Sequence, residues 1–239
     1  MTCAYVLHTR PWRETSLLVD WFTEDLGRLT TRQRGARQSG RKSAVRPLPF
    51  QGMHMMLAGR GDMKVATQID LTEPPRLLTG QALAVGFYLN ELLMRTLGRD
   101  EPMPALFAQY AQSLARLTQE TQTLGLVIRR FERDLLSELG FGIDWTHTSD
   151  QGITVDPEAT YWVDPEVGIL SRRTPAGLAV SGRVIMAIAL DKLPDTPSDQ
   201  RLARDLMQFM MRPHVGAAPF HSRELWRSAP KPIHSLSDT

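Results

Sequence analysis

The first 34 residues set the tightest limit on how this chain can fold, because they hold three short runs of β-branched and aromatic residues separated by turn-type segments. The runs cover Tyr5–Thr9, Ser16–Phe22 and Arg28–Arg34. Strands of this length and spacing are typical of an antiparallel meander, which must close on itself or pair with another segment.

Two further strands are predicted after the meander, at Phe50–Leu57 and Met63–Ile69, with a glycine-containing turn between them. Five strands in the first third of the chain is the strand count of an OB-type barrel, whose strands and loops bind oligonucleotides. An SH3-like or other small barrel fits the count almost as well, and the spacing alone does not separate these folds.

A basic loop follows the third strand, and it contains no acidic residue between Gly27 and Pro47. Residues 1–76 hold twelve Lys and Arg against seven Asp and Glu, a net charge of +5, whereas the rest of the chain carries −3. A barrel with such a loop is suited to binding a polyanion. The candidate DNA-binding residues are Arg32, Arg34, Arg37, Arg41, Lys42 and Arg46.

Single-stranded nucleic acid also needs aromatic rings on which its bases can stack, and Trp12 and Trp21 are the candidates nearest to the loop. A tryptophan on a strand is more often part of the core, so burial is the competing interpretation. For the loop itself, the competing interpretation is a solvated run of charge without a ligand.

After Glu73 the period of the apolar residues changes from two to 3.6, which predicts an α-helical second half. Thr196 and Pro197 provide an N-cap and a first helical residue, and Pro213 is expected to end that helix. The sequence therefore predicts an α+β protein, with an OB-type barrel at residues 1–76 and a helical domain at 77–239 that carries a β-hairpin at about 143–178. The helices are expected at residues 77–97, 102–117, 121–139, 181–190 and 196–213.

The third predicted helix carries three arginines, Arg129, Arg130 and Arg133, beside its apolar stripe. An apolar groove edged by guanidinium groups suits a short acidic peptide that ends in a carboxylate. Judged on the residues alone, neutralisation by the neighbouring Glu132 and Asp134 is the favoured explanation.

Few features favour catalysis or metal binding. The paired acids at Asp156–Glu158 and Asp164–Glu166 each flank a proline, so turn formation explains them better than a nuclease site does. No GxxxxGK[ST] loop is present, and Cys3 is the only cysteine, which excludes a four-cysteine zinc site. We expect no enzyme activity, no cofactor, no metal and no membrane segment, and a cytoplasmic location.

Four stretches carry a resemblance to a known family: AYVLHTRPWRETSLLVDWFTEDLGR with a following GAR, YLNELLMRTL, RRFERDLLSELGFG and SRELWR. Together and in this order they resemble RecO, the bacterial recombination mediator and DNA-repair family, and look closest to its gammaproteobacterial branch. Many members carry a four-cysteine zinc module, but the corresponding stretch here, about 143–173, has no cysteine. We expect packing of Trp145, Tyr161 and Trp162 to replace the metal.

The resemblance implies a non-enzymatic mediator with an OB fold and a helical domain. It implies binding of single- and double-stranded DNA, annealing of complementary strands, docking on the C-terminal tail of single-strand-binding protein (SSB), and action with RecR to load RecA. It also favours Arg129 as the anchor for the SSB tail, with Arg130 and Arg133 as further candidates. Without the resemblance, an OB-fold RNA-binding module linked to the ribosome or tRNA fits the barrel and its arginines equally well.

Overall fold

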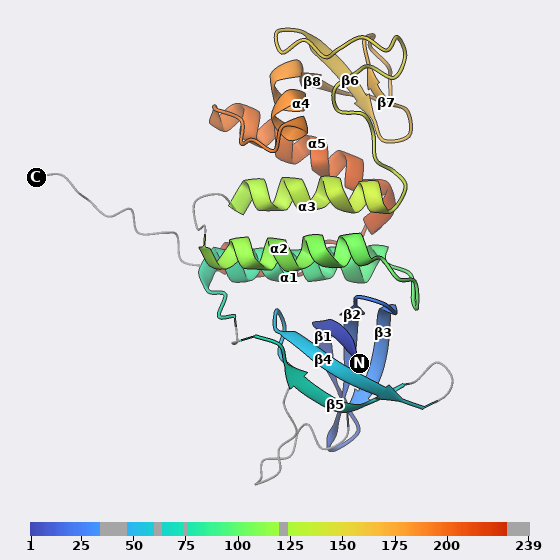
Figure 1. The fold of residues 1–239 in the computed structure, drawn as a ribbon. Helices are drawn as coiled ribbons and strands as arrows, with labels where there is room; N and C mark the ends of the chain where they lie inside the picture. Colours follow the sequence, from blue (N-terminus) through green and yellow to red (C-terminus); the bar gives the residue numbers. More distant parts are fainter. Residues whose placement is uncertain (34–46, 60–63, 74–75, 120–123, 229–239) are drawn as a thin grey trace, which may run out of the picture.

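The computed structural model describes residues 1–33, 47–59, 64–73, 76–119 and 124–228. A β-barrel lies at one end of the molecule, helices are stacked across its middle, and a small second sheet lies at the far end (Figure 1). The α+β class, with its β-barrel first and helices after, is the one predicted.

The barrel has five strands, paired in the order β3-β2-β1-β4-β5. A parallel bridge between Thr31 and Lys64 joins the two outer strands, and the Arg32 amide donates to the Lys64 carbonyl (3.3 Å). This closure leaves β1 paired with both β2 and β4, which is the arrangement of an OB-type barrel. The strands are β1 (Thr2–Trp12), β2 (Ser16–Thr23), β3 (Gly27–Gln33), β4 (Gly52–Ala58) and β5 (Val65–Leu71).

Trp21 fills the interior of the barrel, with no exposed surface, and its indole Nε1 donates to the Thr31 hydroxyl (2.8 Å). A ring enclosed in this way cannot stack on a base, so the proposal of Trp21 as a stacking platform is wrong. The alternation of the strand places it inward, together with Val19 on the same strand. Burial of a tryptophan whose N–H has a partner stabilises the barrel.

Six helices occur in the described residues, and five of them follow the predicted pattern. The Thr196 side chain accepts a hydrogen bond from the Asp199 amide (3.1 Å), so the predicted N-cap is confirmed. Pro213 does not end its helix, which continues for two more residues to Val215; Gly216, with φ of 74°, follows. The helices are α1 (Gly80–Thr96), α2 (Pro104–Gln119), α3 (Leu124–Glu138), α4 (Gly182–Ala189), α5 (Pro197–Val215) and α6 (Ser222–Ser228).

The predicted hairpin is part of a three-stranded sheet, in which β6 (Thr160–Asp164) lies between β7 (Gly168–Leu170) and β8 (Leu178–Ser181). Trp145 and Tyr161 are buried in the main core, and the Tyr161 hydroxyl accepts from the Asp156 amide (2.8 Å). Aromatic packing therefore holds this module to the helices.

Besides the separate cluster inside the barrel, a larger apolar core is shared by the outer face of the barrel and the helices. Tyr5 and Phe22 on the outer face of the barrel meet Phe107 and Tyr110 of α2, with ring centroids 5.2–6.2 Å apart. Asn90 of α1 crosses the same boundary. Its Nδ2 donates to the backbone carbonyls of Val6 and Leu7 in β1 (3.3 and 2.9 Å), where the pairing of β1 with β2 has an irregular register. Its Oδ1 accepts a hydrogen bond from the Tyr110 hydroxyl (2.5 Å).

Candidate nucleic-acid surface and peptide groove

Only one of the six predicted DNA-binding residues lies in the described part of the chain. Arg32 is half-buried on β3, and its backbone takes part in the barrel closure. The remaining candidates lie outside the described residues: Arg34, Arg37, Arg41, Lys42 and Arg46.

The register of the barrel nevertheless shows where the basic segment begins. Leu17 pairs with Gln33, the last residue of β3, while Pro11 pairs with Leu17 from the other side. The turn between β1 and β2 therefore lies at the same end of the barrel as Gln33, the last described residue before the basic segment. Trp12 stands at that turn and is 36% exposed, so it remains a candidate for base stacking.

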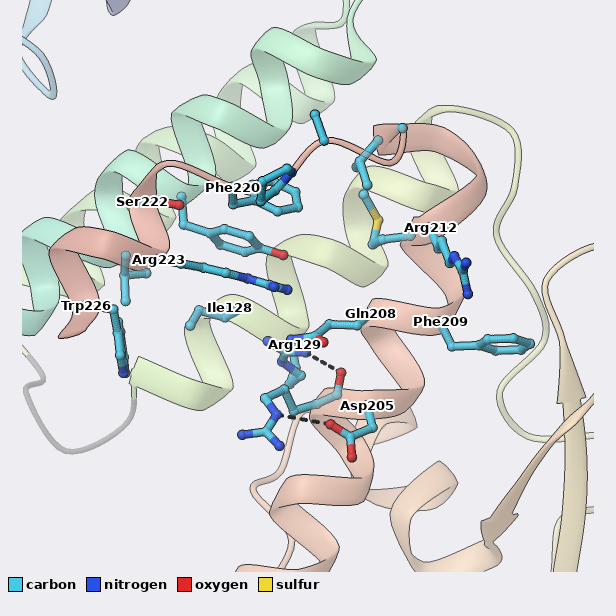
Figure 2. A pocket seen from close by; sticks show the side chains of 18 of the residues that line it. Ile128, Arg129, Asp205, Gln208, Phe209, Arg212, Phe220, Ser222, Arg223 and Trp226 are labelled. Atoms are coloured by element: carbon cyan, nitrogen blue, oxygen red, sulfur yellow. Dashed lines mark hydrogen bonds and ion pairs between the residues drawn. The ribbon is translucent and has the colours of Figure 1, made fainter.

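A groove with a volume of about 860 Å³ opens between α1, α3, α5 and the segment that leads into α6. Figure 2 shows Phe220, Arg223 and Trp226 on one side, Gln208 and Arg212 of α5 on the other, with α3 contributing Ile128 and Arg129. The volume lies within the range of sites for drug-sized ligands. The apolar lining includes Ala84, Val85, Tyr88, Ile128, Leu178, Met211, Val215, Phe220 and Trp226.

The charge on the groove is mostly positive. Arg204, Arg212 and Arg223 are exposed on its rim, and Asp205 is its one acidic lining residue within the described chain. Asp205 is paired with Arg204 (3.1 Å), which leaves the rim with excess positive charge. An apolar trough with guanidinium groups along its edge attracts anionic ligands that carry bulky apolar side chains.

Arg129 lines the floor of this groove and is tied to a buried carboxylate. Its Nη1 lies 2.8 Å from Oε2 of Glu132, which has no exposed surface, and also donates to the carbonyl of Arg204 (3.2 Å). The hydroxyl of Tyr88 donates to the other oxygen of Glu132 (2.5 Å). Burial raises the pKa of Glu132, and Arg129 and Tyr88 only partly oppose that shift.

Arg130 and Arg133 do not line the groove. Arg133 donates to the Ile188 carbonyl at the end of α4 (2.9 Å) and pairs with Asp191 (2.7 Å), while Arg130 lies 3.6 Å from the same aspartate. Asp134 also pairs with both arginines. The structure therefore separates Arg129 from the other two predicted residues, because their side chains turn toward α4.

Residues 216–226 contribute one wall of the groove, although the sequence pattern predicts no helix there. The only signal was SRELWR, in which Arg223 and Trp226 are three apart and so share one helical face. Three of the four stretches that carry the family resemblance meet at this groove. Tyr88 comes from the second, Arg129 from the third and Ser222 from the fourth.

The paired acids near the small sheet act as turn residues. Asp156 accepts from the Glu158 amide (3.0 Å), and Asp164 accepts from the Glu166 amide (2.9 Å). Across the described ranges, no group of three or more His, Cys, Asp or Glu side chains is placed to hold a metal ion. The same residues include no helix that is long and apolar enough to cross a membrane.

An OB-type barrel joined through a shared core to helices with an arginine-rimmed groove has the architecture of a two-part binding protein. Comparison with known families gives its particular identity. The family described as "Recombination protein O N terminal" matches residues 1–75, and "Recombination protein O C terminal" matches residues 77–224. The chain belongs to the RecO family.

Curated relatives agree along nearly the whole chain. It is 36% identical over 222 residues to the DNA repair protein RecO of Photobacterium profundum, covering 93% of each chain. It is 35% identical to the proteins of the same name from Marinobacter nauticus and Shigella flexneri, covering 93% and 94% of this chain and 92% of each relative. Membership supports a role in DNA repair and recombination, and it favours that role over the RNA-binding alternative.

Proposed function

We propose that this protein is a recombination mediator that binds DNA through the basic segment of its barrel and docks on SSB through the groove of its helical half. The observation that carries the docking step is the groove itself, in which an apolar lining meets three exposed arginines on the rim. An SSB tail, which presents acids and a terminal carboxylate, has matching chemistry.

The DNA step is charge neutralisation. Two DNA strands repel each other, and a protein that covers their phosphates with arginine lets them approach while base pairing selects the partner. Docking on SSB raises the local concentration of the mediator on coated single strands without reading sequence. Action with RecR to load RecA completes the proposed role, together with annealing of complementary strands.

Peptide binding tests the docking step. The chain is titrated into a fluorescent peptide with the sequence of the SSB C-terminus, and anisotropy is measured. Arg223→Ala and Arg212→Ala should each raise Kd by about tenfold, because each removes a charge-assisted contact worth about 1.5 kcal/mol. Arg129→Ala should weaken binding as well, and unfolding curves are needed for it because the buried Glu132 would lose its cationic partner.

Arg183→Ala is the matched control, since this arginine is exposed and lies outside the groove, 3.8 Å from Glu158. It should leave Kd unchanged. Equal weakening by the control and the rim variants would mean that the peptide responds only to overall charge, and the proposed groove would then be wrong.

Salt dependence tests the DNA step. If four to six phosphates of single-stranded DNA are covered, log K should fall with log[salt] at a slope of roughly −3 to −4. Reversal of Arg34, Arg37 and Arg41 to Glu should flatten that slope while the peptide affinity stays the same. A slope that these substitutions leave intact would place the DNA site elsewhere on the molecule.

A further inference from the structure

One wall of the groove is a short segment, residues 216–226, that crosses the surface of α1 after α5 ends; we call it the strap. It carries the lining residues Phe220, Ser222, Arg223 and Trp226. A wall built from such a short segment keeps its place only where other elements bind its backbone. Two residues of α1, Glu91 and Arg95, supply those bonds.

Glu91 binds the strap through its carboxylate, which accepts three hydrogen bonds from it. Its two oxygens accept from the backbone amides of His221 and Ser222 and from the Ser222 hydroxyl, each at 3.1 Å. Burial alone would raise the pKa of Glu91, but the hydrogen bonds from Ser222, His221 and Arg95 outweigh it and lower the pKa. The carboxylate is therefore the form that the strap binds.

Arg95, one turn further along α1, binds the strap through its guanidinium group. Its guanidinium donates to the carbonyls of Ala218 (2.6 Å) and Pro219 (2.7 Å), and more weakly to that of Val215 (3.4 Å). The same group lies 4.1 Å from the ring centroid of Phe220 and bonds to Glu91 (2.6 Å). The two side chains thus form one clasp that contacts both ends of the turn before α6.

Neither Glu91 nor Arg95 lines the groove, whereas the strap that they hold supplies one of its walls. We propose that Glu91 and Arg95 are positioning residues for peptide binding, acting through the strap rather than by touching the ligand. This inference rests on the proposed function, because it concerns the same groove. A ligand that needs both walls binds only the fraction of molecules in which the strap is closed.

Glu91→Gln tests the inference with the least change in shape. The amide cannot give charge-assisted acceptors to both backbone amides, and Arg95 loses its ion pair. The His221 and Ser222 amides should exchange hydrogen faster, by roughly tenfold or more. The Kd for the SSB-tail peptide should rise by about the factor by which the closed fraction falls, roughly threefold or more.

Arg95→Lys is a second variant with the charge retained. An ammonium group cannot place two nitrogens on separate carbonyls in the fixed geometry of a guanidinium, so strap protection and peptide affinity should fall together again. In both variants, saturating peptide should restore the protection of the strap amides. If closing of the strap favours peptide binding, then peptide binding must favour closing of the strap by the same factor. A merely structural role for Glu91 or Arg95 would not produce that restoration.

Glu158→Gln is the control, because this carboxylate is exposed and its ion-pair partner, Arg183, is not part of the strap. It should change neither readout. Faster strap exchange with an unchanged Kd would overturn the inference, as would a raised Kd with unchanged exchange. Failure of the wild-type protein to bind the peptide would instead refute the proposed function and remove the basis of this inference with it.

Discussion

At the scale of single residues, the least expected feature is the buried Glu132 beneath the groove. A carboxylate without exposed surface is costly unless it is paired, and here it has an arginine on one side and a tyrosine hydroxyl on the other. Arg129 and Tyr88 both line the groove, so Glu132 fixes two of its side chains from below. Glu132 neutralises part of the charge of Arg129, so Arg212 and Arg223, which are exposed, are better placed to bind an anionic ligand.

The pH dependence of stability should report on Glu132. Burial raises its folded-state pKa above the ordinary 4.5, so the folded state binds this proton more tightly than the unfolded state. Its contribution to stability should therefore decline as pH rises above about 4.5. Glu132→Gln lacks that titration, and the free energy of unfolding, wild type minus variant, should fall between about pH 4 and pH 7 in urea titrations.

Glu91→Gln provides a control of opposite sign, because hydrogen bonds lower the pKa of Glu91. Its stabilising effect should be present above its ordinary pKa of 4.5 and lost as pH falls. The wild-type minus variant difference should thus rise with pH for Glu91 and fall with pH for Glu132. Slopes of the same sign would show that the two carboxylates do not sit in opposite environments.

The outcome for the arginines shows what a sequence can reveal about a site at this scale. The resemblance pointed to Arg129, and the structure places it in a groove. Spacing on a helix could not show that Arg133 turns to Asp191 at the end of α4, because that contact joins residues 58 positions apart. Nor could it bring Arg212 and Arg223 to the same rim, since only the fold of the strap does so.

At the scale of elements, α1 is the helix on which both halves of the molecule depend. Asn90 contacts the barrel, Tyr88 lines the groove, and Glu91 with Arg95 holds the strap. Tyr88, Glu91 and Arg95 are spaced three and four residues apart and so share one face of the helix, whereas Asn90 lies on another face. With partners on both faces, α1 has no exposed residue.

Asn90→Ala tests how firmly α1 is joined to the barrel. The substitution leaves the backbone carbonyl of Leu7 and the hydroxyl of Tyr110 without their buried partner. Because each unsatisfied buried group costs about 1–3 kcal/mol, the free energy of unfolding should fall by about 2–4 kcal/mol. Urea denaturation measures the loss.

Gln112→Ala, an exposed position on α2, is the matched control and should change the free energy of unfolding by less than about 0.5 kcal/mol. A similarly small effect at Asn90 would mean that the barrel and α1 are held together by apolar packing alone.

Most strands and long helices could be predicted from local pattern, because their apolar residues recur with the period of a strand or of a helix. Thr196 gave the start of α5 through its capping chemistry. The misses have other causes. A proline near the end of a helix does not fix its last residue, as Pro213 shows. β8 and α6 are too short for periodicity to identify, so tertiary contacts decide them.

At the scale of the whole molecule, the sequence predicts a barrel and a helical domain with a boundary near residue 76, but it does not predict that the two pack against each other through a shared core. The composition changes there, yet the apolar core runs through the boundary. Gly27 illustrates how close the approach is. Its φ is 68°, and a Cβ added to it would lie 2.0 Å from the backbone oxygen of Glu101, so the barrel meets the helical half without room for a side chain.

This shared core makes a prediction about the barrel in isolation. A fragment of residues 1–76 would expose four apolar side chains that the helices now bury: Tyr5, Leu7, Phe22 and Phe50, which are 7%, 2%, 0% and 4% exposed in the intact chain. Loss of this burial, at about 1.5–3 kcal/mol for each large side chain, is comparable to the whole stability of a small domain. The fragment should therefore lack a cooperative unfolding transition of its own.

The full-length chain should unfold in one transition instead, with strand amides of β1 and helix amides of α2 losing hydrogen-exchange protection together as urea is raised, because the core that the two halves share is lost when either half opens. Separate transitions for barrel and helices, or a fragment 1–76 with a cooperative urea curve, would contradict this. A single transition also means that the barrel and the groove-bearing helices are folded together in the same molecules. Under the proposed function, one folded molecule would then offer its DNA site and its groove at the same time, and linking two sites in one molecule lets two modest affinities combine into a strong one.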